Sequence, residues 1–380
     1  MKTEASVKER YAAGAESREA ALCCPVDYDP QYLKVIPSEV IEKDYGCGDP
    51  SQYVREGETV LDLGSGTGKI CFIASQVVGA SGRVIGVDMT DAMLEVARRN
   101  APIVAERVGY GNVEFRKGRI QDLGLDLEAM DRALAERPIS DANRWLEIEE
   151  LSNELRQATP LVADGSVDVV VSNCVLNLVD VDARRRMFRE IHRVLKRGGR
   201  AVISDIVADE EVPEDLQNDP TLWSGCISGA FREDRFLQAF EEAGFYGVRI
   251  LRWDQEPWQT VKGIQFRSMT VEATKGKEGP CLERKQAVIY KGPFKKVLDD
   301  DGHAMERGKR YAVCDKIYRI YKTSPYADDF EFIDPLQEVP LAEAGPFDCS
   351  RTVFRDPRET KGETYDVTME AGDLCGPDCC

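Results

Sequence analysis

Three cysteines lie in segments whose composition is typical of loops. Cys47 is in YGCGDP, Cys174 in SNCVLNLV and Cys226 in LWSGCISGAF. Cys174 follows VDVVV, a short apolar run that predicts a buried strand. Because ligands of open α/β sheets bind beyond the carboxyl ends of the strands, this thiol is expected to face a ligand. Cys47 precedes the first predicted strand and Cys226 follows the strand ending in SDIV, so three loops are expected to bring three thiols to one edge.

A glycine-rich turn indicates a cofactor site at the same edge. The predicted strand TVLDL continues into DLGSGTG, where Gly64, Gly66 and Gly68 allow a tight turn and a close approach to a ligand. The next predicted strand ends in Asp88, about 20 residues on, the usual place for a carboxylate that binds ribose hydroxyls. Ile70 stands where a phosphate-binding loop requires Ser or Thr, so a nucleoside triphosphate site is disfavoured.

This loop, which starts with Asp62, has the form DxGxGxG rather than the GxGxxG of dinucleotide sites. It resembles the loop of the S-adenosylmethionine methyltransferases of the Rossmann-like class. The resemblance implies that Gly64 and Gly66 face the methionine part of the cofactor and that Asp88 binds the ribose. The remaining implied cofactor contacts are Met89 and the region of Arg119 and Ile120 for the adenine, and Asn173 beside the methyl donor.

Three converging thiolates would suit a soft, thiophilic ion. Trivalent arsenic bound by three thiolates is pyramidal and keeps a lone pair, which can attack a sulfonium methyl carbon without help from a general base. This agrees with a sequence that has only two histidines, His192 in a predicted helix and His303 in a predicted turn. Each cysteine alone is more simply a small buried apolar residue. Zinc is a competing ligand, but structural zinc sites usually contain CxxC pairs, and these three cysteines form none.

Five segments resemble the arsenite S-adenosylmethionine methyltransferases in order and spacing, namely YGCGDP, DLGSGTGK, GVDMTDAMLEVAR, SNCVLNLV and DPTLWSGCISGAF. The resemblance covers roughly residues 30–275 and a C-terminal domain of the same general kind. It implies that Cys47, Cys174 and Cys226 are catalytic residues that bind arsenic. It also implies that Cys71 in GKICFIA is a fourth catalytic cysteine, which passes through an intramolecular disulfide, and that Asn177 supports the Cys174 loop.

The implied reaction moves a methyl group from S-adenosylmethionine to arsenite and yields methylated arsenicals. Methylation formally oxidises arsenic, so glutathione or thioredoxin is expected to deliver arsenite and to return electrons. Two alternatives stay open. A class I methyltransferase with a carbon or oxygen acceptor, such as a quinone or sterol, predicts an apolar pocket and indifference to thiol blocking. A non-catalytic thiol protein that binds soft metals predicts arsenite binding without use of the methyl donor, although the glycine loop and Asp88 argue against it.

Alternating strand and helix segments are expected to position these residues in a doubly wound, mostly parallel sheet of the Rossmann-like methyltransferase type. Strands are predicted at 59–64, 83–89, 112–118, 167–173, 199–207, 246–254 and 264–275, and helices at 7–21, 68–79, 90–108 and 182–199. We expect an N-terminal helix and substrate loop at 1–50, the methyltransferase domain at 51–275, and a smaller β-rich domain with a cysteine-rich tail at 276–380. A helical insertion at 126–160 is expected to pack on the sheet edge through Trp145, Ile148, Leu151 and Leu155.

Composition limits the classes of function. The chain has 380 residues, which favours two domains, and 42% hydrophobic residues, which suffices for compact cores. A net charge of −18 disfavours nucleic acid and anionic membranes as partners. No signal-peptide core or membrane span is predicted, so we expect a cytoplasmic protein whose 12 cysteines stay reduced. Cys23, Cys24, Cys375, Cys379 and Cys380 are extra thiols that either relay arsenite or have no role in the reaction.

Overall fold

The computed structural model describes residues 2–16, 26–43, 45–139 and 141–362. The expectations for Cys23, Cys24 and the three tail cysteines therefore lie outside the described residues. The chain forms two compact units, Met1–Gly276 and Lys277–Cys380, and the first unit ends one residue after the boundary expected from the sequence. None of the described helices has the length and apolar character that crossing a membrane requires.

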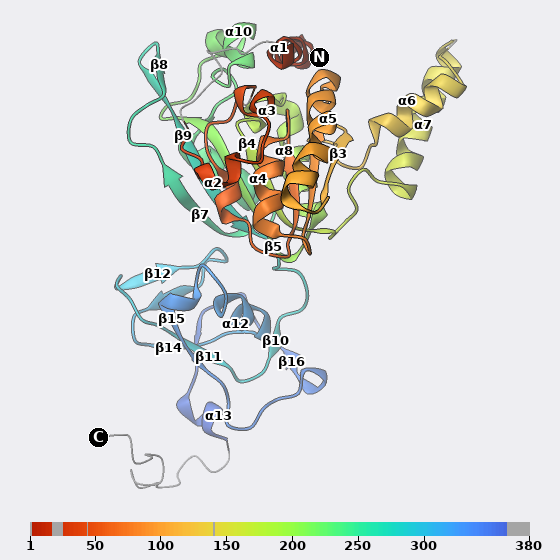
Figure 1. Cartoon of the computed structure of the whole chain (residues 1–380). Coiled ribbons are helices and arrows are strands. Elements are labelled where there is room, and N and C mark those ends of the chain that lie inside the picture. Colours follow the sequence, from red (N-terminus) through yellow and green to blue (C-terminus); the bar gives the residue numbers. More distant parts are fainter. Residues whose placement is uncertain (1, 17–25, 44, 140, 363–380) are drawn as a thin grey trace. The chain divides into compact units, whose positions relative to one another are not determined.

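A nine-stranded sheet forms the centre of the first unit (Figure 1). The main path of the sheet has the order β3-β2-β1-β4-β5-β9-β7, while β6 pairs with β5 and β8 with β9. Strands β1 to β5 run parallel, and β9 is antiparallel to each of its neighbours. The predicted mostly parallel, doubly wound fold is confirmed. The strands are β1 (Thr59–Leu63), β2 (Arg83–Asp88), β3 (Val113–Lys117), β4 (Val167–Asn173), β5 (Leu195–Ala208), β6 (Phe231–Arg232), β7 (Tyr246–Trp253), β8 (Gln259–Val261) and β9 (Ile264–Thr274).

Helices cover both faces of this sheet because each has an apolar stripe. On one face, α4 (Lys69–Val78) and α5 (Asp91–Val108) bury residues such as Phe72 and Leu94. On the other face, α8 (Val181–Val194) and α11 (Glu233–Glu242) bury residues such as Phe188 and Phe240. The shorter elements of this unit are α1 (Lys2–Glu16), α2 (Pro30–Leu33), α3 (Ser38–Glu42), η2 (Pro50–Tyr53), η3 (Leu176–Leu178), α9 (Glu214–Gln217) and α10 (Pro220–Ser224).

Two predicted helix boundaries were wrong. The helix expected at 182–199 ends at Val194, and β5 begins at Leu195. Gly198 takes a left-handed φ of 82° and its N–H donates to Lys275 O at 2.7 Å, so the lysine- and glycine-rich segment pairs with neighbouring strands. The helix expected at 7–21 is α1, which starts earlier, at Lys2.

The helical insertion forms α6 (Leu127–Glu136) and α7 (Ala142–Ala158), which extend away from the central sheet (Figure 1). The predicted packing of Trp145 was wrong, because this side chain is 65% exposed. No residue of α7 is buried. Ile148, Leu151 and Leu155, the other three residues of the predicted apolar face, are half-buried. Near the C-terminal end of the helix, Arg156 pairs with Asp122 at 2.9 Å.

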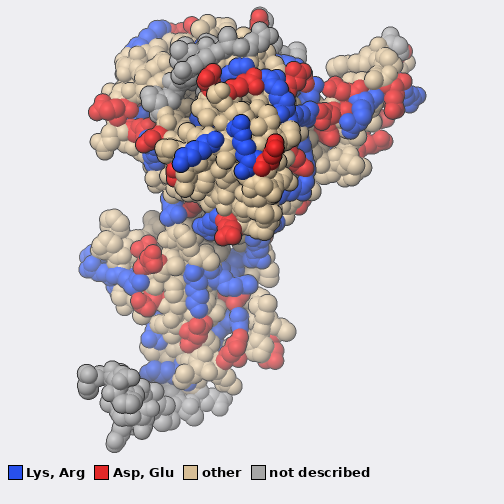
Figure 2. Space-filling view, in the orientation of Figure 1, with Lys and Arg blue, Asp and Glu red and all other residues tan. Residues whose placement is uncertain are grey.

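The second unit is β-rich, as predicted. Its largest sheet has the order β15-β11-β14-β17, and two further pairs are β10 with β16 and β12 with β13. On the visible face of each unit, acidic and basic side chains are interspersed rather than gathered by sign (Figure 2). The elements are β10 (Leu282–Glu283), β11 (Ala287–Tyr290), β12 (Lys296–Leu298), β13 (Ala304–Glu306), β14 (Arg310–Ala312), α12 (Asp315–Tyr321), η4 (Ala327–Asp329), β15 (Phe330–Ile333), η5 (Leu341–Glu343), β16 (Gly345–Pro346), β17 (Val353–Phe354) and α13 (Pro357–Lys361).

Candidate active site

The glycine loop follows β1 directly and closes against the end of β2. Gly64 has a φ of 70°, and a Cβ atom at this position would lie 2.4 Å from Val175 Cγ1, so only glycine fits there. Gly66 N–H donates to Asp88 Oδ2 at 2.9 Å, and Thr90 N–H donates to Asp88 Oδ1 at 2.8 Å. Burial raises the pKa of Asp88, while these backbone donors lower it in part. The carboxylate thus braces the loop and remains at the pocket wall.

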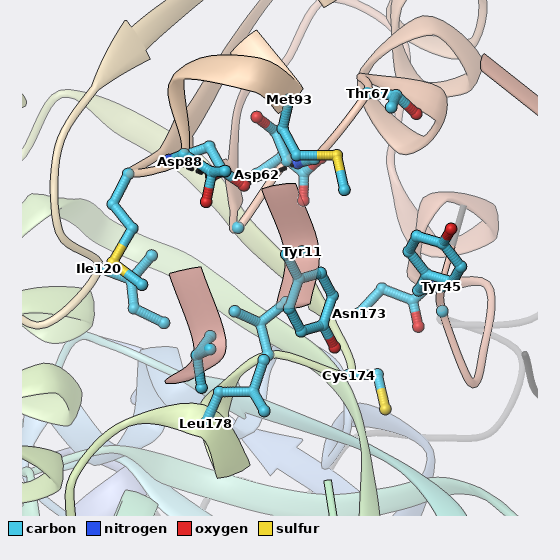
Figure 3. A pocket seen from close by; sticks show the side chains of 18 of the residues that line it. Tyr11, Tyr45, Asp62, Thr67, Asp88, Met93, Ile120, Asn173, Cys174 and Leu178 are labelled. Carbon is cyan, nitrogen blue, oxygen red and sulfur yellow. Dashed lines mark hydrogen bonds between the residues drawn. The ribbon is translucent and has the colours of Figure 1, made fainter. Parts of the chain in front are cut away.

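A pocket with an empty volume of about 940 Å³ opens beside this loop. Apolar side chains such as Met93 and Leu178 line it together with the two carboxylates Asp62 and Asp88. In Figure 3 the carboxylates lie at one end of the pocket and Cys174 at the other. The buried Ser65 hydroxyl in the loop has no hydrogen-bond partner among the described residues, so a polar ligand group would satisfy it. This combination fits a nucleoside with a charged amino-acid part.

The structure brings all of the predicted cofactor-binding residues to this pocket. Those that line it are Asp62, Gly64, Gly66, Asp88, Met89, Ile120 and Asn173. The Asn173 side chain also forms hydrogen bonds to the loop that contains Cys47. Its Oδ1 accepts from Cys47 N–H at 2.8 Å and from Gly48 N–H at 3.0 Å, and its Nδ2 donates to Gly48 O at 2.7 Å. The Asn173 amide therefore holds the Cys47 loop against the end of β4.

The predicted thiols come together at the far end of the pocket. Cys174 Sγ lies within 4.8 Å of Cys47 Sγ and of an Asp205 carboxylate oxygen. Cys226 reaches the same place, because its Sγ donates to Cys174 O at 3.3 Å. Cys174 and Cys226 have φ values of 61° and 63°, a left-handed conformation that costs energy in residues with a Cβ. The strained backbone therefore occurs at two thiols that are neighbours in space.

The electrostatic environment keeps these thiols protonated. The hydrogen bond from Cys226 lowers the pKa of Cys174, but the hydrogen bond to Cys47, burial, and negative charge at Cys47 and Asp205 raise it well above its usual value. The hydrogen bond to Cys174, followed by burial, raises the pKa of Cys226 in the same direction. Coordination to a thiophilic ion would remove these protons. The cluster is thus suited to bind by replacing S–H with bonds to the ion.

Cys71 is not part of this cluster. It lies on α4 with no exposed surface, and its Sγ donates to Asp62 Oδ2 at 3.2 Å. Burial, followed by the negative charge of Asp62, raises the pKa of Cys71 well above its usual value. A disulfide between Cys71 and a clustered thiol would require Cys71 to leave its hydrogen bond with Asp62, and its redox role stays a prediction.

A second cleft is lined by one of these thiols. Cys47 lines it together with Trp253, Trp258 and Ser268, whereas Cys174 lines the cofactor pocket. The neighbouring thiols therefore stand between two openings. One can admit the methyl donor and the other a separate substrate.

Relatives with assigned activities resemble most of the chain. An arsenite methyltransferase of Aquipseudomonas alcaligenes is 33% identical over 332 residues, which cover 83% of this chain and 85% of that protein. The human arsenite methyltransferase is 30% identical over 366 residues, which cover 90% of this chain and 86% of that protein. Residues 55–244 match a family described as a methyltransferase domain. The chain belongs to the arsenite methyltransferases.

Solved structures agree with this family. The crystal structure of CrArsM, an arsenic(III) S-adenosylmethionine methyltransferase from Chlamydomonas reinhardtii, is 28% identical, with a TM-score of 0.54. The similarity covers 87% of this chain and 100% of that one, so it extends beyond the methyltransferase core. Residues 277–365 of the present chain match a family described as a domain of unknown function, DUF8838.

Two residues of the site, Asp205 and Tyr11, were not predicted from the sequence. Asp205 near the end of β5 accepts from Leu176 N–H at 2.8 Å and from Asn177 Nδ2 at 2.8 Å, so it fixes the turn after Cys174. Burial raises the pKa of Asp205 to about 6. Asp205 could have been predicted, because its segment SDIV ends a predicted strand directly before a loop. Tyr11 on α1 carried no signal, since nothing in the sequence ties the N-terminal helix to Cys226.

Tyr11 joins α1 to the cluster. Its hydroxyl donates a hydrogen bond that lowers the pKa of Cys226, while burial and then the two thiols Cys226 and Cys174 raise the pKa of Tyr11. Arg10 Nη1 donates to Thr221 O at 2.9 Å, which fastens α1 to α10 next to the Cys226 loop. Figure 1 shows α1 and α10 together above the sheet. The N-terminal helix therefore forms part of the wall around the thiols.

Asn173→Ala should lower the rate of arsenite methylation by about 10- to 100-fold, the range seen when a residue that orients a ligand is lost. The rate should fall because the Cys47 loop loses its hydrogen bonds to the Asn173 side-chain amide. Initial rates measure the effect. Asn218→Ala, which removes an exposed amide bound to Glu214 O, is the matched control and should keep the wild-type rate. An unchanged rate in Asn173→Ala would exclude the positioning role.

Tyr11→Phe should slow arsenite methylation by about fivefold, the effect of one hydrogen bond worth about 1 kcal/mol. Loss of the hydroxyl raises the pKa of Cys226 further and loosens α1 at the cluster. The slower rate is measured at fixed S-adenosylmethionine. Tyr110→Phe removes a hydroxyl bound to Ser75 O and serves as the control. Equal rates in the two variants would contradict a contribution of Tyr11.

Proposed function

We propose that this chain transfers a methyl group from S-adenosylmethionine to trivalent arsenic bound by Cys47, Cys174 and Cys226. The convergence of three loops carries the proposal, because it gathers the thiols at the end of a pocket that has a glycine loop and Asp88 at its other end. Membership of the arsenite methyltransferases supports the same reaction. The left-handed backbone at Cys174 and Cys226 supports a functional demand for both thiols, since strained residues concentrate at functional sites.

Arsenite binds by exchange of ligands. Each thiol replaces one oxygen ligand of As(OH)₃, its proton leaves with that oxygen as water, and no electrons are transferred. Three such exchanges give a pyramidal arsenic with a free lone pair. The protein needs no external base for this step, which agrees with raised pKa values at Cys174 and Cys226. The cleft lined by Cys47 and Trp258 is the route for the arsenical.

S-adenosylmethionine, when bound, supplies an electrophilic methyl group on a sulfonium. The residues of the chain orient this reaction rather than take part in bond making. Asp88 binds the ribose and braces the loop at Gly66, and the apolar wall around Met93 and Ile120 receives the adenine. Asn173 holds the Cys47 loop beside the transfer path. Orientation of two reactants in this way can lower the barrier by about 7–11 kcal/mol.

Methyl transfer raises arsenic from the trivalent to the pentavalent state, so two electrons must follow for a second cycle. A thiol reductant, glutathione or thioredoxin, supplies them in this proposal, with Cys71 as a catalytic relay. Cys71 must leave its hydrogen bond with Asp62 to act. A cytoplasmic location, where thiols stay reduced, belongs to the same proposal.

A carbon acceptor is the second candidate. A ubiquinone/menaquinone biosynthesis C-methyltransferase of Klebsiella pneumoniae is 29% identical over 153 residues, but this covers only 40% of the present chain. The apolar lining of the cofactor pocket is compatible with such an acceptor. The clustered thiols have no part in that chemistry, so arsenite is favoured.

An assay of purified, reduced protein with labelled S-adenosylmethionine and arsenite tests the proposal. Chromatography should show the label in mono- and dimethylated arsenic. Prior alkylation of the thiols should stop this product. If cofactor binding is intact but the label stays out of arsenic, the acceptor is a different compound. If arsenite binds without any use of the methyl donor, the chain is a binding protein.

A further inference from the structure

A second group of three cysteines lies in the C-terminal unit, outside the site described above. The Sγ atoms of Cys281, Cys314 and Cys349 all lie within 4.8 Å of one another. Cys314 is buried, the other two are half-buried, and all three are free thiols. We call them the C-terminal thiol cluster. It lies inside the domain of unknown function at residues 277–365, to which no activity is assigned.

Regular structure holds each member in place. Cys281 precedes β10, which pairs with β16, and its carbonyl accepts from Phe347 N–H at 2.9 Å. Cys314 starts α12, and its Sγ accepts a 3.4 Å hydrogen bond from the backbone N–H three residues later. His303 Nε2 donates to Cys349 O at 2.8 Å. Three segments far apart in sequence thus meet at their sulfur atoms.

A pocket gives access to the cluster. A pocket with an empty volume of about 320 Å³ is lined by Cys314 and Cys349. The same pocket is lined by His303 and Tyr321, so polar side chains as well as sulfur atoms face it. An ion that enters this pocket meets two of the three thiols directly.

The number of ligands decides which ion fits. Zinc takes four protein ligands in structural sites. Among the described residues, no fourth cysteine, histidine or carboxylate has its ligand atom within 4.8 Å of all three sulfurs. Three soft thiolates, with no fourth ligand in the described part of the chain, match a pyramidal trivalent arsenic centre.

We propose that the C-terminal thiol cluster is a second binding site for trivalent arsenic. Binding is the same exchange as before: three As–O bonds are replaced by three As–S bonds, three water molecules leave, and arsenic keeps its oxidation state. The site holds one arsenic atom per chain. It depends on none of the three acceptor thiols, so it stands whether or not the proposed methyl transfer occurs.

A full-length variant isolates the cluster. In it, eight cysteines are replaced by serine, namely Cys23, Cys24, Cys47, Cys174, Cys226, Cys375, Cys379 and Cys380. Cys71 stays, because it is fully buried in the core. With arsenite in a phosphine-reduced buffer, this variant should bind one arsenic per chain, and X-ray absorption should show three sulfur neighbours. Adding Cys281→Ser should weaken binding by at least about tenfold, while Ser350→Ala in the same region should not.

Protection from alkylation provides a test in the unmodified chain, which also covers variants that fail to fold. Arsenite should slow the alkylation of all three cluster cysteines, as peptide mass spectrometry would show. Alkylation rates that do not change with arsenite would overturn the proposal. So would fewer than three sulfur neighbours in the eight-serine variant, or binding of zinc ions in place of arsenite by that variant.

Discussion

Cys174→Ser is expected to abolish arsenite methylation while S-adenosylmethionine still binds with its normal affinity. Cys174 is the member of the cluster that contacts both other thiols, and its side chain lies at the end of the pocket opposite Asp62 and Asp88 (Figure 3). Serine keeps the size of the residue but offers arsenic a poor, hard ligand. Loss of a proposed direct ligand should exceed the effect of losing an orienting residue, so the rate should fall by more than about 100-fold.

Two measurements on Cys174→Ser distinguish a loss of arsenite binding from a loss of cofactor binding. Methylated arsenic is measured by chromatography, and cofactor affinity by calorimetry on the same preparation. Ser166→Ala is the control, because it removes an exposed hydroxyl that donates to Ala163 O away from the pocket, and it should keep the rate of methyl transfer. If Cys174→Ser lost its cofactor affinity, the residue would belong to the cofactor side of the pocket and the assignment of the acceptor site would be wrong.

Asp88→Ala is expected to have the opposite profile, with cofactor binding lost and arsenite binding kept. The carboxylate accepts from Gly66 N–H at 2.9 Å and ends the strand beside the pocket, so its removal loosens the loop and removes the proposed ribose partner. Hydrogen bonds to a charged group contribute about 1.5–3 kcal/mol, so affinity for S-adenosylmethionine should fall by about 100-fold. Calorimetry with the cofactor measures this loss.

Asp131→Ala controls for a general effect of charge. Its side chain is 60% exposed, pairs with Lys117 and is not among the residues that line the cofactor pocket. It should leave both affinities unchanged. Arsenite stoichiometry in Asp88→Ala should equal that of the wild type, because the thiols are held by Asn173 and Asp205 instead. A joint loss of cofactor and arsenite binding would mean that the two halves of the pocket fold as one unit.

Local sequence signals predicted the central sheet well. The strand before Gly64 and the strand before Cys174 are short, apolar and β-branched, and both occur within a residue of their predicted limits. The end of α8 was missed, because lysine and glycine after Leu195 read as a helix terminus while tertiary pairing draws them into β5. Trp145 was missed for a related reason, since a helical apolar stripe says nothing about whether a partner surface exists.

The site was predictable where residues belong to loops at the ends of strands. Cys174 and Cys226 were expected at one edge because parallel strands end at a common edge. Cys47 was expected there with the loop before the first strand, and the structure places the three thiols together. Neither the left-handed backbone at two of these cysteines nor the bond from Tyr11 could be predicted. Both depend on packing between segments that are distant in the chain.

The left-handed backbone conformation of Cys174 and Cys226 affects the stability of the fold. A glycine at position 174 or 226 would relieve backbone strain of about 1–2 kcal/mol, but it would also remove a buried side chain from a core cluster. Either substitution would remove a thiol of the proposed acceptor site. Stabilising changes for a bioremediation catalyst therefore belong elsewhere, for example on the exposed surface of α7.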